Sequence, residues 1–146
     1  MKHIILAILA LLFILPIFAQ NADRITGVWY NGEKTSKIEI SQAKDGSFVG
    51  KIIWLSVPND AKGKAKTDAL NPEKELQSRP LINLQVLSGL SYKGKGKYVG
   101  GKIYDPKSGK TYSAKAEMPN NNTIALRGFI GIALAGRTDT WVRTTK

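Results

Sequence analysis

The side chains of this chain that could do acid–base chemistry are carboxylates, tyrosines and lysines. The sequence has no cysteine, and its one histidine, His3, stands at the N-terminus. Proton transfer would depend on acids such as Asp68, Glu117 or Asp139, and nothing in their spacing pairs them. Zinc sites normally use His or Cys, and the sequence shows no acidic calcium loop, so we expect no metal and no cofactor. A carboxylate-based enzyme is the remaining catalytic alternative, and the sequence favours a protein that is not an enzyme.

Two arginines near the C-terminus could hold an acidic group of a ligand. A guanidinium donates two parallel hydrogen bonds to a carboxylate or phosphate, whereas a lysine acts as a less directional charge. Arg127 and Arg137 are therefore candidate ligand-binding residues, and the aromatic residues Trp54, Tyr104 and Tyr112 complete the candidate set. The alternative is that the arginines pair with acids or with strand-end carbonyls, and that the aromatic residues fill a core.

The N-terminus has the layout of a secretory signal peptide. Lys2 precedes an apolar run over residues 4–15, a proline follows the run, and small Ala19 marks a cleavage site. We predict that residues 1–19 are removed, that residues 20–146 form one domain, and that the product is exported to the periplasm or beyond the cell. A retained membrane anchor is the alternative, but the run is shorter than the ~18–20 apolar residues that cross a bilayer.

The chain is strongly basic. It has 22 Lys and Arg against 11 Asp and Glu, which gives a formal net charge of +11. Such a charge attracts polyanions, and an exported protein meets anionic lipid and polysaccharide rather than nucleic acid. The expected partners are a small amphiphilic ligand or an anionic envelope component, with no nucleic acid and no stable membrane insertion. A surface that charge merely keeps soluble is the alternative.

Short runs of alternating apolar and polar residues cover most of the chain after the leader. Gly, Asn, Asp and Pro separate the runs, as in Asn31-Gly32 and Asp45-Gly46, which is typical of strands joined by tight turns. Glycines inside the runs permit the coiling that closes a sheet. We predict an all-β fold, a single eight-stranded antiparallel up-and-down β-barrel. The strands are expected at residues 24–30, 35–41, 47–55, 81–88, 97–104, 111–118, 123–130 and 137–144.

The stretch over residues 56–80 departs from the strand pattern. It is polar and rich in lysine, and it contains Asn71-Pro72, an Asn cap followed by a proline in the first turn of a helix. We expect a long loop that covers one end of the barrel and carries a short helix over residues 72–77.

Gly27 and Trp29 open the first expected strand, and Trp141 and Arg143 end the last. This bracketing resembles the calycin superfamily of lipocalins and fatty-acid-binding proteins, in which an arginine of the final strand covers the tryptophan of an N-terminal Gly-x-Trp. The resemblance implies that these four residues close the barrel and that Arg143 lies over Trp29. A guanidinium over an indole contributes about 0.5–2 kcal/mol.

A set of short motifs follows in order along the chain: Gly50-Lys51-Ile52, Asn71-Pro72, Arg79-Pro80-Leu81, and residues 100–106, 108–112, 126–131 and 136–138. These motifs are similar to those of an exported bacterial family known as domain of unknown function 2147. The resemblance implies a barrel of lipocalin type outside the cytoplasm, without an established reaction or ligand.

An eight-stranded barrel is either filled by its own side chains or wide enough for one small ligand. Small residues expected to face inward, Ala114, Ala116 and Gly128, favour an apolar cavity with a basic mouth below the long loop. We predict an exported, non-enzymatic binding protein that holds a small apolar or amphiphilic ligand with an acidic head. The alternative is a basic envelope-interaction module with a filled barrel that binds anionic lipid or polysaccharide surfaces.

Overall fold

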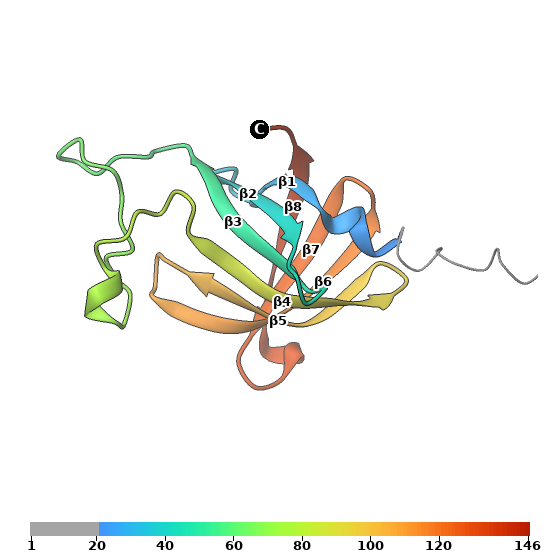
Figure 1. Cartoon of the computed structure of the whole chain (residues 1–146). Coiled ribbons are helices and arrows are strands. Elements are labelled where there is room, and N and C mark those ends of the chain that lie inside the picture. Colours follow the sequence, from blue (N-terminus) through green and yellow to red (C-terminus); the bar gives the residue numbers. More distant parts are fainter. Residues whose placement is uncertain (1–20) are drawn as a thin grey trace, which may run out of the picture.

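The computed structural model describes residues 21–146, so the predicted leader at residues 1–19 lies outside the described residues. Eight strands form a closed antiparallel barrel in which each strand pairs with the next and β8 pairs back to β1 (Figure 1). The predicted eight-stranded antiparallel barrel is confirmed. The strands are β1 (Gly27–Tyr30), β2 (Ser36–Gln42), β3 (Phe48–Leu55), β4 (Gln85–Gly94), β5 (Lys97–Asp105), β6 (Lys110–Asn120), β7 (Thr123–Phe129) and β8 (Arg137–Thr144).

The connections alternate between the two ends of the barrel, because consecutive strands run in opposite directions. The β1–β2, β3–β4, β5–β6 and β7–β8 connections share one end, which we name the open end. The other end, the closed end, carries the three remaining connections and the 3-10 helix η2 (Asp23–Ile25) that precedes β1. Figure 1 shows the long β3–β4 connection and η2 on opposite sides of the barrel.

The closed half of the barrel is filled with apolar side chains. Alternation along β6 buries Ala114, Ala116 and Met118 and exposes the residues between them. Phe48 and Tyr98 are almost fully buried and meet edge-on, with ring centroids 5.6 Å apart. Each large side chain buried in this way contributes about 1.5–3 kcal/mol relative to exposure, so this half supplies the stable core on which the open end is built.

Strand β4 begins and ends later than the expected strand over residues 81–88. Leu81 and Leu84 instead close a turn, in which the Leu84 N–H donates to the Leu81 carbonyl at 3.1 Å. At the other end, Gly89 does not break the strand. It adopts a φ of 68° at a bulge in the β3–β4 register, and the strand continues to Gly94.

The helix expected over residues 72–77 is a single 3-10 turn, η3 (Lys74–Leu76). The Asn71 side chain does accept the Glu73 N–H at 2.8 Å, as an N-cap would. The Gln77 side chain, however, donates back to the Asn71 carbonyl at 2.8 Å, and no residue of η3 is buried. A turn without an apolar face has nothing to pack against, so it does not extend into an α-helix.

Candidate functional site

A cavity of about 1260 Å³ occupies the open end of the barrel. All four connections of this end contribute residues to its lining, as do strands from around the ring. Ligand sites commonly have volumes of about 300–1,000 Å³. The open half of the barrel therefore has room for a small molecule, whereas the closed half is packed.

The walls of the cavity are mainly apolar. Gly128 on β7 helps to keep the lumen free, because a Cβ added there would lie 3.3 Å from the Ile103 side chain and 3.6 Å from Tyr112. Ala114 and Ala116, which were expected to provide this space, are buried in the packed core and do not line the cavity. The apolar lining residues on the strands are Ile38, Ile52, Leu55, Val86, Ile103, Phe129 and Trp141.

Charged side chains of both signs surround the mouth of the cavity. The acidic ones are Glu33, Asp60, Asp105 and Asp139, and the basic ones are Lys64, Lys66, Lys107 and Arg137. Four acids balance four bases in formal charge, so the mouth is not basic as the sequence led us to expect. The acidic and the basic side chains differ in how many already have a hydrogen-bond or ion-pair partner within the protein.

The acids of the rim are engaged by the protein itself. Asp60 and Asp105 each accept backbone N–H groups in turns of their own connections. Asp139 accepts the indole N–H of Trp141 at 2.8 Å. Such bonds satisfy the carboxylate oxygens and leave less capacity for a ligand.

Three of the four basic side chains at the mouth have no hydrogen-bond or ion-pair partner among residues 21–146. Lys107 forms an exposed ion pair with Glu33 at 2.8 Å, and the hydrogen bond from Lys107 lowers the pKa of the Glu33 carboxyl. Within residues 21–146, the side chains of Lys64, Lys66 and Arg137 make no hydrogen bond or ion pair. These three cations are available to an anionic group at the mouth.

Buried Asp68 fixes the long β3–β4 connection to the barrel. Its Oδ1 accepts the hydroxyl of Tyr104 on β5 at 2.5 Å. Its Oδ2 accepts Nε and Nη2 of Arg79 at 3.0 and 2.8 Å, and the Asn71 side-chain amide at 2.8 Å. A carboxylate with no exposed surface is tolerable only when it is paired and hydrogen-bonded in this way. The cluster holds the connection at the rim of the cavity.

Tyr104 joins this anchor to the cavity, because it also lines the lumen. Burial raises the pKa of its phenol, and the hydrogen bond to Asp68 together with the charge of that carboxylate raises it further. The hydroxyl therefore stays protonated at neutral pH and remains a donor to Asp68. Because its hydroxyl donates to Asp68, Tyr104 can contact a ligand through its aromatic ring rather than by donating a hydrogen bond.

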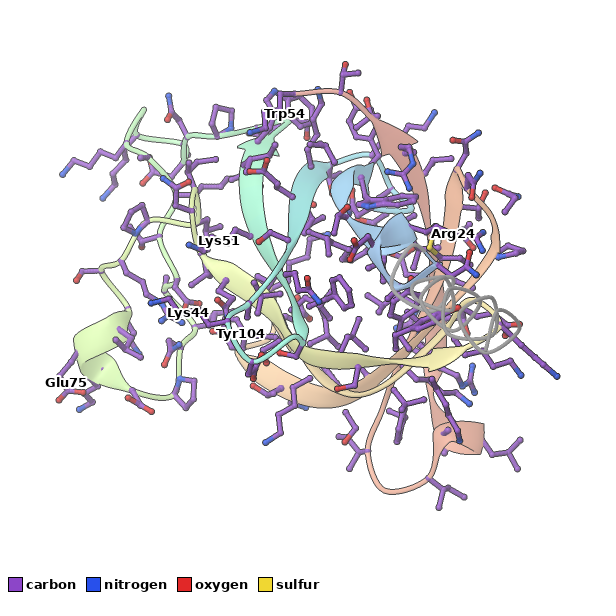
Figure 2. All side chains as sticks on the ribbon, turned by 45° about the vertical axis from the view of Figure 1, so that its right-hand side comes forward. Arg24, Lys44, Lys51, Trp54, Glu75 and Tyr104 are labelled. Carbon is purple, nitrogen blue, oxygen red and sulfur yellow. The ribbon has the colours of Figure 1, made fainter. Side chains whose placement is uncertain are left out.

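The structure brings three of the five candidate ligand-binding residues together. Tyr104, Tyr112 and Arg137 line the cavity. Trp54 does not, and Figure 2 shows it at the end of β3, away from Tyr104. Its ring packs edge-on against Tyr30, with centroids 5.9 Å apart, on the outer face of the barrel.

The fifth candidate, Arg127, is committed to the β7–β8 connection. Its guanidinium donates to the backbone carbonyls of Ala133 and Leu134 and, at 2.9 Å, to the hydroxyl of Thr138. Arg127 does not line the cavity. It positions the 3-10 helix η4 (Ala133–Ala135) beside the mouth.

At the closed end, the Arg143 guanidinium lies over the Trp29 ring at 4.1 Å from its centroid. It also donates to the Thr26 carbonyl at 2.8 Å and the Arg24 carbonyl at 2.6 Å. Gly27 is required here, since its φ is 127° and a Cβ would lie 2.6 Å from Arg143 Nη1. Trp141, which the resemblance grouped with these residues, lines the cavity instead.

The Asp68 anchor was not identified from the sequence as a unit. Asn71 and Arg79 belong to the motifs shared with the family, and the sequence marks Asp68 only as a possible catalytic acid. Their spacing does not reveal that a loop folds back on itself, so no local pattern could have joined them. The Asn71-Pro72 and Arg79-Pro80 pairs were the available signals.

The described residues show neither a metal centre nor a membrane-crossing helix. Residues 21–146 contain no group of three or more His, Cys, Asp or Glu side chains that could hold a metal ion. No helix in this part of the chain is long and apolar enough to cross a membrane.

Comparisons with known proteins agree with this architecture. A comparison with curated proteins gives no match. A solved structure described as "Protein HP1028 from the human pathogen Helicobacter pylori belongs to the lipocalin family" is similar, with a TM-score of 0.72 and 28% sequence identity over 83% of each chain. The family model described as "Uncharacterized protein conserved in bacteria (DUF2147)" matches residues 27–143. The chain therefore belongs to the DUF2147 family, and its barrel is lipocalin-like.

Proposed function

We propose that the protein binds one small molecule with an apolar body and an acidic head, and releases it unchanged. The single observation that carries this proposal is the cavity of about 1260 Å³ with apolar walls, in a barrel whose other half is packed. A lipocalin-like barrel is generally a binding fold. A preformed apolar lumen favours a ligand whose body loses contact with water on entry.

The free cations of the rim support the acidic head. Lys64 and Lys66 come from the β3–β4 connection and Arg137 from the start of β8, so the mouth offers cations on two elements to a carboxylate or phosphate. The arginine would set the orientation of the head through its fork of N–H donors, and the lysines would add charge.

A non-catalytic role is supported by the state of the acids. Asp68 is buried with all its bonds inside the anchor, and Asp139 is held by Trp141. Neither carboxylate has a free oxygen placed beside a second acid, as paired acid–base catalysis requires. We further propose that the leader at residues 1–19 exports the protein, so that it meets its ligand in the periplasm or beyond the cell.

The net charge of +11 is what favours the alternative, a module that binds anionic envelope surfaces. That alternative assumed a filled barrel. The open lumen supports the binding-protein proposal more strongly. Binding to an anionic surface would then serve to bring the protein to its ligand.

The proposal is tested with a fluorescent fatty acid titrated into the exported protein, residues 20–146. We expect saturable binding with one site per chain. Ile103→Trp places a large ring in the lumen and should weaken binding at least about tenfold by steric exclusion. Lys102→Trp, its exposed neighbour on the outer face of β5, is the matched control and should bind normally.

A second arm of the same titration tests the head group. Arg137→Gln should weaken binding of the fatty acid about five- to tenfold and leave the corresponding fatty alcohol unchanged, because only the acid carries a charge to lose. Lys115→Gln on the outer face of β6 is the charge control. Absence of binding by the unaltered protein across a series of acyl lengths would reject the proposal.

A further inference from the structure

The large exposed apolar side chains gather at the open end. The β7–β8 connection carries Ile130, Ile132 and Leu134, which are 70%, 66% and 86% exposed. Val57 and Leu70 on the β3–β4 connection are also more than half exposed. Soluble proteins seldom leave such side chains clustered in water, and a cluster of this kind indicates a surface that meets another apolar phase.

Three backbone carbonyls of the β7–β8 connection already have donors within the protein. The carbonyls of Ala133 and Leu134 both accept hydrogen bonds from the Arg127 guanidinium, which reaches them from the barrel side. The Ile132 carbonyl accepts the Ala135 N–H at 3.2 Å. An exposed loop normally leaves such groups to water, and entry into lipid would then cost several kcal/mol for each one. Here three successive carbonyls keep their partners when water is removed.

The charges around this connection fit an anionic surface. The chain has no acidic residue between Glu117 and Asp139, and Arg127 and Arg137 flank the apolar tip. At the same end of the barrel, on the opposite side of the ring, the side chain of Lys62 on the β3–β4 connection makes no hydrogen bond or ion pair within residues 21–146. An uncharged tip bordered by cations is complementary to a layer of anionic headgroups above acyl chains.

The connection is also part of the cavity. Ile130 and Ala135 belong to the lining, so the apolar tip borders the mouth through which a ligand would pass. An amphiphile leaving a bilayer at this point would move from acyl chains to an apolar lumen.

We propose that the β7–β8 connection inserts Ile132 and Leu134 into the surface of an anionic lipid bilayer and sets the cavity mouth against it. The bilayer is thus both the docking partner and the source of the ligand. The docking proposal is supported by the exposed apolar side chains, the hydrogen-bonded carbonyls and the flanking cations of the connection. The transfer of a ligand from the bilayer depends in addition on the function proposed above.

Site-specific fluorescence tests the docking. Because the chain has no cysteine, Leu134→Cys can be labelled at one position with an environment-sensitive dye in the exported protein, residues 20–146. Vesicles of phosphatidylglycerol should shift its emission to the blue, and vesicles of phosphatidylcholine should shift it far less. Val142→Cys, an exposed apolar position on β8, is the matched control and should not respond.

The unlabelled double variant Ile132→Ser/Leu134→Ser should partition to the anionic vesicles at least about tenfold more weakly than the unaltered protein. No emission change at position 134, or an equal change at position 142, would overturn the proposal. If the emission changes with protein concentration in the absence of vesicles, the β7–β8 connection contacts a second copy of the chain. That result would also overturn the docking proposal.

Failure of docking and failure of the proposed function are separable. The double variant keeps the lumen, so it should bind the fluorescent fatty acid normally in vesicle-free solution. Loss of vesicle binding by the unaltered protein with fatty-acid binding intact counts against docking alone. Vesicle binding without uptake of the fatty acid counts against the cavity.

Discussion

Arg143 on the last strand holds the first strand and the turn before it through one side chain. It covers the Trp29 ring, and it supplies donors to three carbonyls, those of Arg24, Thr26 and Asn121. The strands that carry Arg143 and Trp29 pair directly in the barrel. Removing the guanidinium would leave these carbonyls without donors and uncover the indole.

Arg143→Leu should lower the free energy of unfolding by about 2–4 kcal/mol, through the lost stacking and hydrogen bonds. Arg143→Lys should recover only a small part, because an ammonium keeps the charge but not the fork of donors. Urea denaturation at neutral pH measures both. Equal stability of the arginine and lysine proteins would contradict this role.

Because of Tyr98, the closed end should lose stability as the pH rises into the alkaline range. Burial, together with the charge of Tyr92, raises the pKa of its phenol to about 12 from an ordinary value near 10. The folded state thus holds the neutral phenol, whose hydroxyl donates to the Ala22 carbonyl at 2.7 Å. The contribution is complete below pH 10 and declines as the pH rises from 10 to about 12.

Tyr98→Phe should cost about 0.5–1.5 kcal/mol at neutral pH by removing that hydrogen bond. The stability difference between the two proteins should shrink between pH 10 and 12, because only the unaltered protein loses stability as Tyr98 ionises. Denaturation curves collected across this range check it. A difference that stays constant with pH would refute the assignment.

Alternation along the strands, together with one bulge, decides which candidate side chains line the cavity. Tyr112 and Arg137 line it. On β7, alternation itself points Arg127 away from the lumen. Trp54 would face inward with Ile52, but a bulge shifts the β2–β3 register beside Ile52, and the following side chains change faces. No Gly, Asn or Pro marks this bulge in the sequence, so alternation alone could not predict the change of face at Trp54.

The β3–β4 connection is the element that the sequence described least well. Its existence and length could be predicted from its polar composition, whereas its order depends on contacts between residues far apart in the chain. Asp68 and Tyr104 are 36 positions apart. The short helix expected over residues 72–77 is limited to the 3-10 turn η3 because the segment's few hydrogen bonds turn the chain back toward Arg79, and no apolar face supports a longer helix.

Asp68→Ala should loosen this connection without unfolding the barrel. Breaking a buried ion pair would lower the local opening free energy by about 2–3 kcal/mol, so amide exchange over residues 66–81 should accelerate roughly 30- to 150-fold. Hydrogen–deuterium exchange measured by mass spectrometry detects this. Asp60→Ala, an exposed turn residue of the same connection, is the control and should have a much smaller effect.

Exchange that accelerates equally in β5 and β6 would show that Asp68 supports the whole barrel rather than the connection. Unchanged exchange over the connection would show that the anchor contributes nothing to its order.

For the whole molecule, the closed barrel followed from short alternating runs and internal glycines, whereas the state of its interior did not. Whether eight strands enclose a filled or an open lumen depends on packing at each level along the axis. Here the closed half is filled around Phe48 and Tyr98, and the open half is not. The same barrel thus combines a stable core with a binding site.

The net charge of the whole chain also differs from the balance of charges at the mouth of the cavity. The chain carries a formal net charge of +11, but acids and bases balance at the mouth of the cavity. Its acids are hydrogen-bonded or ion-paired, and three of its cations have no side-chain partner in the part of the chain that the structure describes. Composition predicts attraction to anionic surfaces over long distances, while the hydrogen bonds of individual carboxylates decide which groups can contact a ligand.

Native mass spectrometry of the protein purified from its own host shows whether the lumen holds one acidic amphiphile. We expect a species heavier than the chain by the mass of one small acidic amphiphile, which dissociates on collisional activation and is missing from Ile103→Trp but present in Lys102→Trp. A bare protein mass in all three, together with no uptake from a series of added fatty acids, would contradict it.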